Sequence, residues 1–309
     1  MGADHSKPPL GGNQGFEGDA AFTGSSFTSS GGRVLGHGPL MALQTIDPRV
    51  LFSVEPLRAE RVFNDYFGAF GHAFPDERER APLQRYYNKL HDPMSPLIVQ
   101  AFVSDGKVVG GVHYRILDTG KERVGFCEHF WINPDLQGSA LHLTLSEENE
   151  AIIKAHGVDA LIREMYDPNL VDLKHRDSIR EGGLSPESRL AVWEKQGWKV
   201  LDAPYLQPAL AGREVGVEDL MLGFKPLSER VSADGMPIEQ YTRILKAYFN
   251  SFLDNAAESP DCRWLDAALS EQQFVKAIPL NQPRTCIGAD VCLAATADVS
   301  AASVPSIDI

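Results

Sequence analysis

The chain contains few cysteines, few basic residues and no long apolar run, and each shortage excludes a class of protein. Its 309 residues include only four cysteines, too few for the disulfide framework of a small secreted domain. Lysine and arginine number 29 against 42 acidic residues, for a net charge of −13, which disfavours binding to nucleic acid or to an acidic membrane. No stretch approaches the roughly 18 apolar residues of a membrane span, and the N-terminus has no apolar signal-peptide core. We therefore expect a cytoplasmic protein that binds neither nucleic acid nor membrane.

The cysteines also give no sign of a metal site. Cys127 lies inside an apolar strand pattern, which is typical of a small buried hydrophobic residue. Cys286 and Cys292 are close in sequence. Common zinc sites of mixed ligands pair two cysteines with two histidines, and no such pair of histidines lies near these cysteines. We expect no bound metal.

Composition divides the chain into four parts. Hydrophobic residues make up 43% of the whole, enough for a packed core, but both ends are rich in small residues and poor in large apolar ones. We predict a flexible segment over 1–40, a main domain over 41–226, a helical extension over 227–284 and a flexible tail over 285–309. In the extension, a helix over 237–254 carries a wide apolar stripe that must pack on something, and we regard it as a contact surface for a homodimer.

Apolar spacing predicts the elements of the main domain. Segments with apolar residues at helical spacing precede a hairpin, whose turn is Ser104-Asp-Gly-Lys107. A strand, a helix and a second strand follow directly, an order that predicts a right-handed crossover between parallel strands. The expected elements are helices over 56–72, 76–90, 139–156 and 186–196, and strands over 97–103, 108–116, 122–132, 158–165, 198–201 and 218–224.

The segment from Val124 to His142 is the most informative part of the chain. β-forming residues continue to Ile132 and stop at Asn133-Pro-Asp135, and a polar turn then enters the helix. The first N–H groups of a helix are unpaired and lie at its positive dipole end, so they attract phosphate. This segment therefore predicts a site for a phosphorylated cofactor.

The order of elements over roughly residues 45–226 resembles the fold of the GCN5-related N-acetyltransferase (GNAT) family. In that family an aliphatic-x-Pro sequence precedes a loop of the form Arg/Gln-x-x-Gly-x-Gly/Ala, which holds the pyrophosphate of acyl-CoA. Here Ile132-Asn-Pro134 is followed by Gln137-Gly-Ser-Ala-Leu-His142. The resemblance implies an α/β (α+β) fold, with a mixed, mostly antiparallel twisted sheet, a central parallel strand pair, flanking helices and the helical extension.

The resemblance also implies the ligands and the residues that bind them. The co-substrate is acetyl-CoA or another acyl-CoA, and the acceptor is a small-molecule or peptide amine. Backbone N–H groups near the end of the strand over 122–132 polarise the thioester carbonyl, and the following loop binds phosphate. The implied cofactor-binding residues are Phe130, Trp131, Ile132, Gln137, Gly138, Ser139, Ala140, Leu141 and His142.

Two departures from the family pattern bear on activity. Ala140 and His142 stand where glycines are usual, so the loop cannot adopt backbone angles that require glycine. Trp193 replaces a tyrosine that in many members protonates the leaving thiolate, in a motif that here ends at Gly197-Trp198. Because an indole N–H is no useful acid near neutral pH, the role is vacant or filled from elsewhere. We name Tyr205 as the phenol that replaces it, with packing at the sheet edge as the alternative.

Glu128 and His129 are the candidates for the catalytic base. Adjacent strand residues face opposite ways, and Glu128 is expected on the face of Phe126 and Phe130, where burial raises the pKa of a carboxyl group. His129 titrates near neutrality without assistance. The same positions also suit a hydrogen-bonded strand carboxylate and a buried core histidine.

Three functions remain open at this stage. The first is an acyl-CoA-dependent N-acyltransferase that transfers the acyl group directly. The second keeps the fold and the CoA ester but changes the chemistry to that of a hydrolase or a decarboxylase. The third is a non-catalytic CoA-binding or interaction module, in which the helix over 237–254 mediates association.

Overall fold

The computed structural model describes residues 43–74, 77–137, 140–171, 184–209, 216–253, 256 and 259–285. Its strands are β1 (Leu43–Ile46), β2 (Leu97–Ser104), β3 (Lys107–Asp118), β4 (Arg123–Ile132), β5 (Ala160–Tyr166), β6 (Lys199–Leu201), β7 (Leu220–Pro226), β8 (Gly235–Pro237) and β9 (Phe274–Pro279). Its helices are α1 (Pro48–Val54), α2 (Pro56–Ala73), α3 (Leu83–His91), α4 (Ala140–Ala155), α6 (Pro186–Lys195), α7 (Ile238–Phe252) and α8 (Pro260–Ala268). Two short 3₁₀ turns are η1 (Glu77–Glu79) and η2 (Pro134–Leu136).

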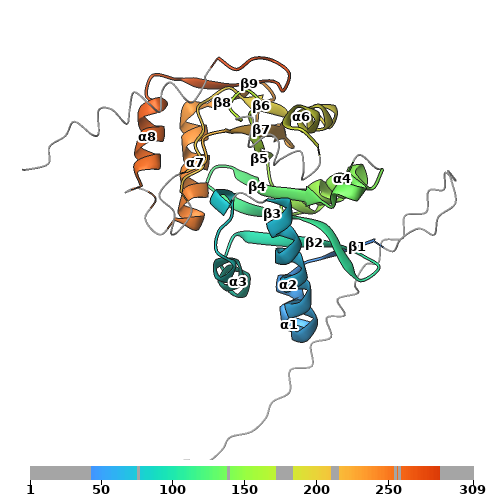
Figure 1. Ribbon diagram of the computed structural model, residues 1–309. Coiled ribbons are helices and arrows are strands. Elements are labelled where there is room, and N and C mark those ends of the chain that lie inside the picture. The colour runs from blue at the N-terminus through green and yellow to red at the C-terminus, as the bar shows by residue number, and fades with distance from the viewer. Residues whose placement is uncertain are drawn as a thin grey trace, which may run out of the picture. The chain divides into compact units, whose positions relative to one another are not determined.

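The strands form one mixed sheet in the order β1-β2-β3-β4-β5-β7-β6-β9-β8 (Figure 1). Within the described residues, β4 and β5 are the parallel pair, and the other neighbours are antiparallel. The predicted fold class is therefore confirmed. The parallel pairing covers only Val124–Cys127 against Ala160–Arg163, so β4 and β5 separate beyond those residues.

The hairpin of β2 and β3 forms where the sequence predicts it. Asp105 and Gly106 both have positive φ, 49° and 76°, as a two-residue hairpin turn of this kind requires. Between β3 and β4 the register shifts, because His113 lies opposite His129 while Tyr114 lies opposite Cys127. Glu128 is the extra residue of this β-bulge, and a bulge reverses which face the following side chains occupy.

Helices cover both faces of the sheet. On one side, here called the α4 face, residues of α4 and α6 pack with Cys127 and Leu161. On the other side, here called the α7 face, α7 and α8 pack against Phe126 and Ile162, and α2 and α3 cover β2 and β3. Figure 1 shows α7 and α8 on the opposite side of the sheet from α4 and α6. None of the helices in the described ranges has the length and apolar character needed to cross a bilayer.

The C-terminal extension contributes to the same sheet. Besides α7 and α8 it supplies β8 and β9, and β9 pairs with β6, which the sequence did not indicate. The apolar stripe of α7 is buried inside the chain, where Phe126 stacks on Tyr248 with ring centroids 3.7 Å apart. The proposed role of this stripe as a surface between two copies is therefore wrong, because the α7 face of the sheet covers it.

The predicted helix over 76–90 is two elements. The 3₁₀ turn η1 ends at Glu79, and α3 begins only at Leu83, after Pro82 at its N-cap position. A residue that precedes proline is disfavoured in helical backbone, which explains the break at Ala81. The break matters for the site, since it places Glu79 beside β4 rather than on a helix.

Candidate active site

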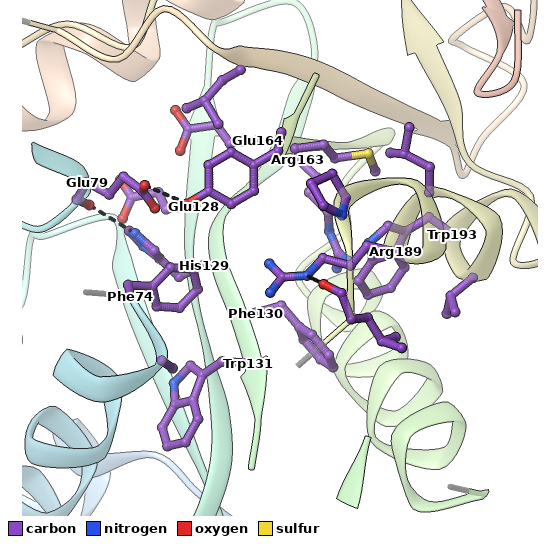
Figure 2. Close-up of a pocket in the computed structure, with 18 of the residues that line it drawn as sticks. Phe74, Glu79, Glu128, His129, Phe130, Trp131, Arg163, Glu164, Arg189 and Trp193 are labelled. Atoms are coloured by element: carbon purple, nitrogen blue, oxygen red, sulfur yellow. Dashed lines mark hydrogen bonds between the residues drawn. The ribbon is translucent and has the colours of Figure 1, made fainter. Parts of the chain in front are cut away.

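A pocket of about 120 Å³ lies where β4 and β5 separate (Figure 2). Its lining comes from both faces of the sheet. From the α4 face it includes Phe130, His142, Arg163 and Trp193, and from the α7 face Glu79, Glu128, His129 and Glu164. The pocket therefore passes through the sheet, and ligands can meet in it from opposite sides.

The backbone of β4 presents N–H groups to this gap. The Asn133 N–H donates to the Val109 carbonyl at 2.8 Å, toward β3. Because successive residues of a strand direct their backbone groups to opposite sides, the N–H groups of Phe130 and Ile132 point away from β3, toward the gap. The Ile132 carbonyl, which accepts from Gln137 Nε2 at 3.1 Å, has the same direction. This geometry suits a thioester carbonyl beside Phe130.

Glu128 and His129 lie on one face, contrary to the expectation that they point opposite ways. The bulge at Glu128 brings both to the α7 face, where they line the pocket, while Phe130 lies on the α4 face. Glu128 therefore shares a face with Phe126 but not with Phe130. Its carboxylate is buried and accepts from Arg115 Nε at 2.5 Å.

His129 is a buried neutral imidazole. Its Nε2 lies 3.0 Å from the Glu79 carbonyl oxygen, and since a carbonyl only accepts, Nε2 carries the proton. Burial lowers the pKa of His129, and Phe70 and Phe74 pack edge-on against the ring. Atoms of His113, Glu128 and His129 lie within 4.8 Å of one another, but Arg115 already holds the Glu128 carboxylate. We assign no metal to this group.

Glu164 is a further candidate base, which sequence reasoning missed. Tyr205 and Tyr248 donate their hydroxyl protons to its Oε1, and Gln207 Nε2 donates to Oε2 at 3.1 Å. Burial raises the pKa of Glu164 to about 8, and the hydrogen bonds from the two tyrosines partly oppose that rise. A carboxyl group with such a pKa exchanges protons near physiological pH, as a general base must.

Glu79 completes a group of three carboxyl residues on the α7 face, here called the acidic cluster (Glu79, Glu128 and Glu164). The Tyr166 hydroxyl donates to Glu79 Oε1 at 2.5 Å. In Figure 2 the three labelled glutamates lie together, on the opposite side of β4 from Trp193. The cluster favours a cationic ligand group over an anionic one.

The predicted phosphate loop is only partly described. Gly138 and Ser139 lie outside the described residues, as do the side chains of Ala140 and Leu141. Gln137 lines the pocket, and its carboxamide connects two segments, donating to the Ile132 carbonyl and accepting from the Leu184 N–H at 3.0 Å. Its contact with phosphate stays a prediction.

His142 lies in the pocket wall. It is 8% exposed, stacks on Phe130 with ring centroids 5.8 Å apart and meets Trp193 edge-on. Burial, together with the charge of Arg163, lowers the pKa of His142. The imidazole is therefore neutral near pH 7 and does not add positive charge for a pyrophosphate.

Trp193 and Tyr205 occupy different sides of the sheet. Trp193 packs on the α4 face against the guanidinium of Arg163, 3.6 Å from its ring centroid. Tyr205 is buried on the α7 face, where its hydroxyl donates to Glu164. Burial raises the pKa of Tyr205 well above its ordinary value. Tyr205 does not line the pocket and contacts it through Glu164, so it is a positioning residue for that carboxylate.

The sequence contains a feature that could have identified Arg163 and Glu164 as site residues. They are adjacent charged residues inside the apolar strand Val158-Asp-Ala-Leu-Ile-Arg-Glu-Met165. A parallel strand in the middle of a sheet is covered on both faces, so its two neighbouring charges are both buried, one on each face. Buried charges of this kind mark functional sites.

Comparison with known proteins gives one family match and a set of structures of low sequence identity. Residues 59–169 match the Acetyltransferase (GNAT) family, and no curated protein matches the chain. PaiA N-acetyltransferase from Thermoplasma acidophilum, in complex with coenzyme A, is 13% identical with a TM-score of 0.39, covering 60% of this chain and 100% of that one. An acetyltransferase from Streptococcus agalactiae is 12% identical with a TM-score of 0.38, covering 60% and 98%.

The sheet with its parallel pair and the pocket between β4 and β5 define an α/β protein with a ligand site that crosses the sheet. Residues 59–169, about a third of the chain, match the model of the GNAT acetyltransferase family. This match supports acyl-CoA-dependent N-acetyltransferase activity and does not identify the acceptor.

Proposed function

We propose that the acceptor is a positively charged small-molecule or peptide amine, which enters from the α7 face while acyl-CoA enters from the α4 face. The observation that carries this proposal is the pocket through the sheet, with the acidic cluster on one side. An amine that is protonated in solution is attracted by carboxylates and must lose a proton before it reacts. Both requirements fit the α7 side.

We assign the base to Glu164 and the polarisation of the thioester to the Phe130 N–H. The amine nitrogen attacks the thioester carbon, while the ammonium proton has passed to the Glu164 carboxylate. The carbon–sulfur bond then breaks, and the CoA thiolate takes up the second proton, which the attacking nitrogen gives up as the amide forms. Glu128, held by Arg115, and Glu79 keep the amine in place.

Cys127 and Cys262 are free thiols, which supports a reducing, cytoplasmic setting.

The proposal is tested with the full chain, acetyl-CoA, CoA and a panel of amines. We expect a higher melting temperature with either CoA ligand, and thiol release that requires an amine. Glu164→Gln should lower turnover by about 100-fold or more, which is the typical contribution of a general base to the rate. It should not change the rise in melting temperature that CoA causes. Glu60→Gln removes a carboxylate of α2 that accepts from Tyr87 at 2.8 Å and serves as the control.

Two outcomes contradict the proposal. Thiol release that needs no amine identifies a hydrolase. A melting shift without thiol release, with every amine tested, identifies a CoA-binding module.

A further inference from the structure

Arg163 lies at the inner end of the α4 side of the pocket. It is the last residue of β5 that pairs with β4, opposite Cys127, and its side chain points to the α4 face. Arg163 is 5% exposed and lines the pocket (Figure 2). A guanidinium is thus held at the point where the two strands begin to separate.

This guanidinium has no carboxylate partner among the described residues. Its Nε and Nη1 lack a hydrogen-bond partner, and its polar neighbours are the Cys127 thiol and, at longer range, the Glu150 carboxylate. Glu150 is already paired with Lys225 at 2.6 Å. Three aromatic rings surround it, with ring centroids 3.6 Å (Trp193), 4.7 Å (Trp198) and 5.3 Å (Phe130) from Arg163 Cζ. Aromatic faces attract a cation but do not replace its hydrogen bonds.

The other buried arginines show what this one is missing. Three arginines are buried in the described part of the chain, namely Arg115, Arg163 and Arg284. Arg115 Nε lies 2.5 Å from Glu128, and Arg284 Nη1 lies 2.9 Å from Asp167. A buried charge is costly unless it is paired and hydrogen-bonded. The structure follows this rule twice and departs from it where the arginine faces the pocket, which indicates an anion brought by a ligand.

We propose that Arg163 binds a carboxylate on the acyl group of the donor, so that the enzyme prefers the CoA ester of a dicarboxylic acid to a plain fatty or acetyl ester. This inference rests on the proposed function. The thioester carbonyl is placed beside Phe130, whose ring lies 5.3 Å from the guanidinium, so a carboxylate a few carbons away reaches Arg163. An acidic acceptor does not fit, because the acidic cluster on the other side repels it.

The test measures the affinity of the full chain for CoA, acetyl-CoA, butyryl-CoA and succinyl-CoA by titration calorimetry. Succinyl and butyryl groups have equal chain length and differ in the terminal carboxylate. We expect succinyl-CoA to bind about tenfold or more tightly than butyryl-CoA, since a site built for a polar group discriminates against an analogue without it. In Arg163→Gln this preference should fall to about one, and Arg163→Lys should retain part of it.

Arg243→Gln is the matched control. It also removes a guanidinium, one that is paired with Glu122 at 2.8 Å and does not line the pocket, and the preference for succinyl-CoA should persist. Equal affinity for succinyl-CoA and butyryl-CoA in the unchanged chain overturns the inference, even if the variants fail to fold. So does an equal loss of affinity for all four ligands in Arg163→Gln, which assigns the guanidinium to the CoA part. If none of the four ligands binds, the proposed function itself fails.

Discussion

The two sides of the pocket treat buried charge in opposite ways. On the α7 side, carboxyl groups are held by donors, with Arg115 on Glu128, Tyr166 on Glu79 and Tyr205 on Glu164. On the α4 side, the cation Arg163 is enclosed by aromatic rings and has no carboxylate partner in the described chain. The first arrangement is complete within the protein, whereas the second is completed by a ligand.

This difference fits a reaction between partners of opposite charge. A cationic amine approaches three carboxyl groups, and an anionic CoA ester approaches a guanidinium, so neither partner is attracted to the side of the other. The β-bulge at Glu128 and the early end of the β4–β5 pairing create both environments within a few residues of β4. The comparison also predicts how the two sides respond to substitution.

The largest expected effect is on stability. Arg115→Met leaves the Glu128 carboxylate buried without its cation, which should lower the free energy of unfolding by about 3–5 kcal/mol. Arg163→Met leaves no carboxylate behind and should change it by less than about 1 kcal/mol. Urea denaturation of both variants measures the contrast, and the double variant Arg115→Met with Glu128→Gln should recover part of the loss. Similar losses in the two single variants would contradict the contrast between the two sides.

The next effect concerns the pH dependence of turnover. A base must be ionised to act, and the pKa of Glu164 is about 8, so kcat/KM should rise with pH and level off above about pH 8. Because the hydrogen bond from Tyr205 lowers the pKa of Glu164, Tyr205→Phe should move the midpoint upward, by about one pH unit.

Tyr248→Phe is the matched comparison for this profile. The Tyr248 hydroxyl lies farther from Glu164, at 3.3 Å, so the midpoint should move less than in Tyr205→Phe. A midpoint that does not change in either variant would assign the proton transfer to another group.

The smallest effect is expected at the entrance to the α4 side. Gln137→Glu adds a negative charge where the CoA pyrophosphate is predicted. Because the site is partly exposed to solvent, the repulsion between the two charges should weaken CoA binding by about three- to tenfold. Gln84→Glu makes the same change on α3, where Gln84 bonds to Asn88 on an exposed helix face, and should leave CoA affinity unchanged. Unchanged affinity in Gln137→Glu would remove this residue from the cofactor site.

Much of the fold was predictable from local sequence because local rules govern its turns and helix ends. Asp105-Gly106 specifies the hairpin of β2 and β3, and Ser185 caps α6 by accepting from the Ser188 N–H. The direct succession of β4, α4 and β5 predicts the parallel pair. The strands β8 and β9 were not predictable, since they are short and form by pairing with residues distant in sequence.

The candidate site was predictable only in outline. Glu128 and His129 were found because they interrupt an apolar strand, but their common face depends on a bulge that sequence alternation does not reveal. Glu164 was missed although it stands in an equally apolar strand. Its raised pKa needs Tyr205 and Tyr248 beside it, and these come from segments 41 and 84 residues away along the chain.

The sequence by itself determined most strands and helices of the central domain and which family that domain resembles, because periodicity and capping act over a few residues. Only the tertiary structure decided which charges meet. It set Arg163 among three aromatic rings and Glu164 among hydroxyl groups, because burial and pairing depend on residues that are brought together only when the sheet has assembled.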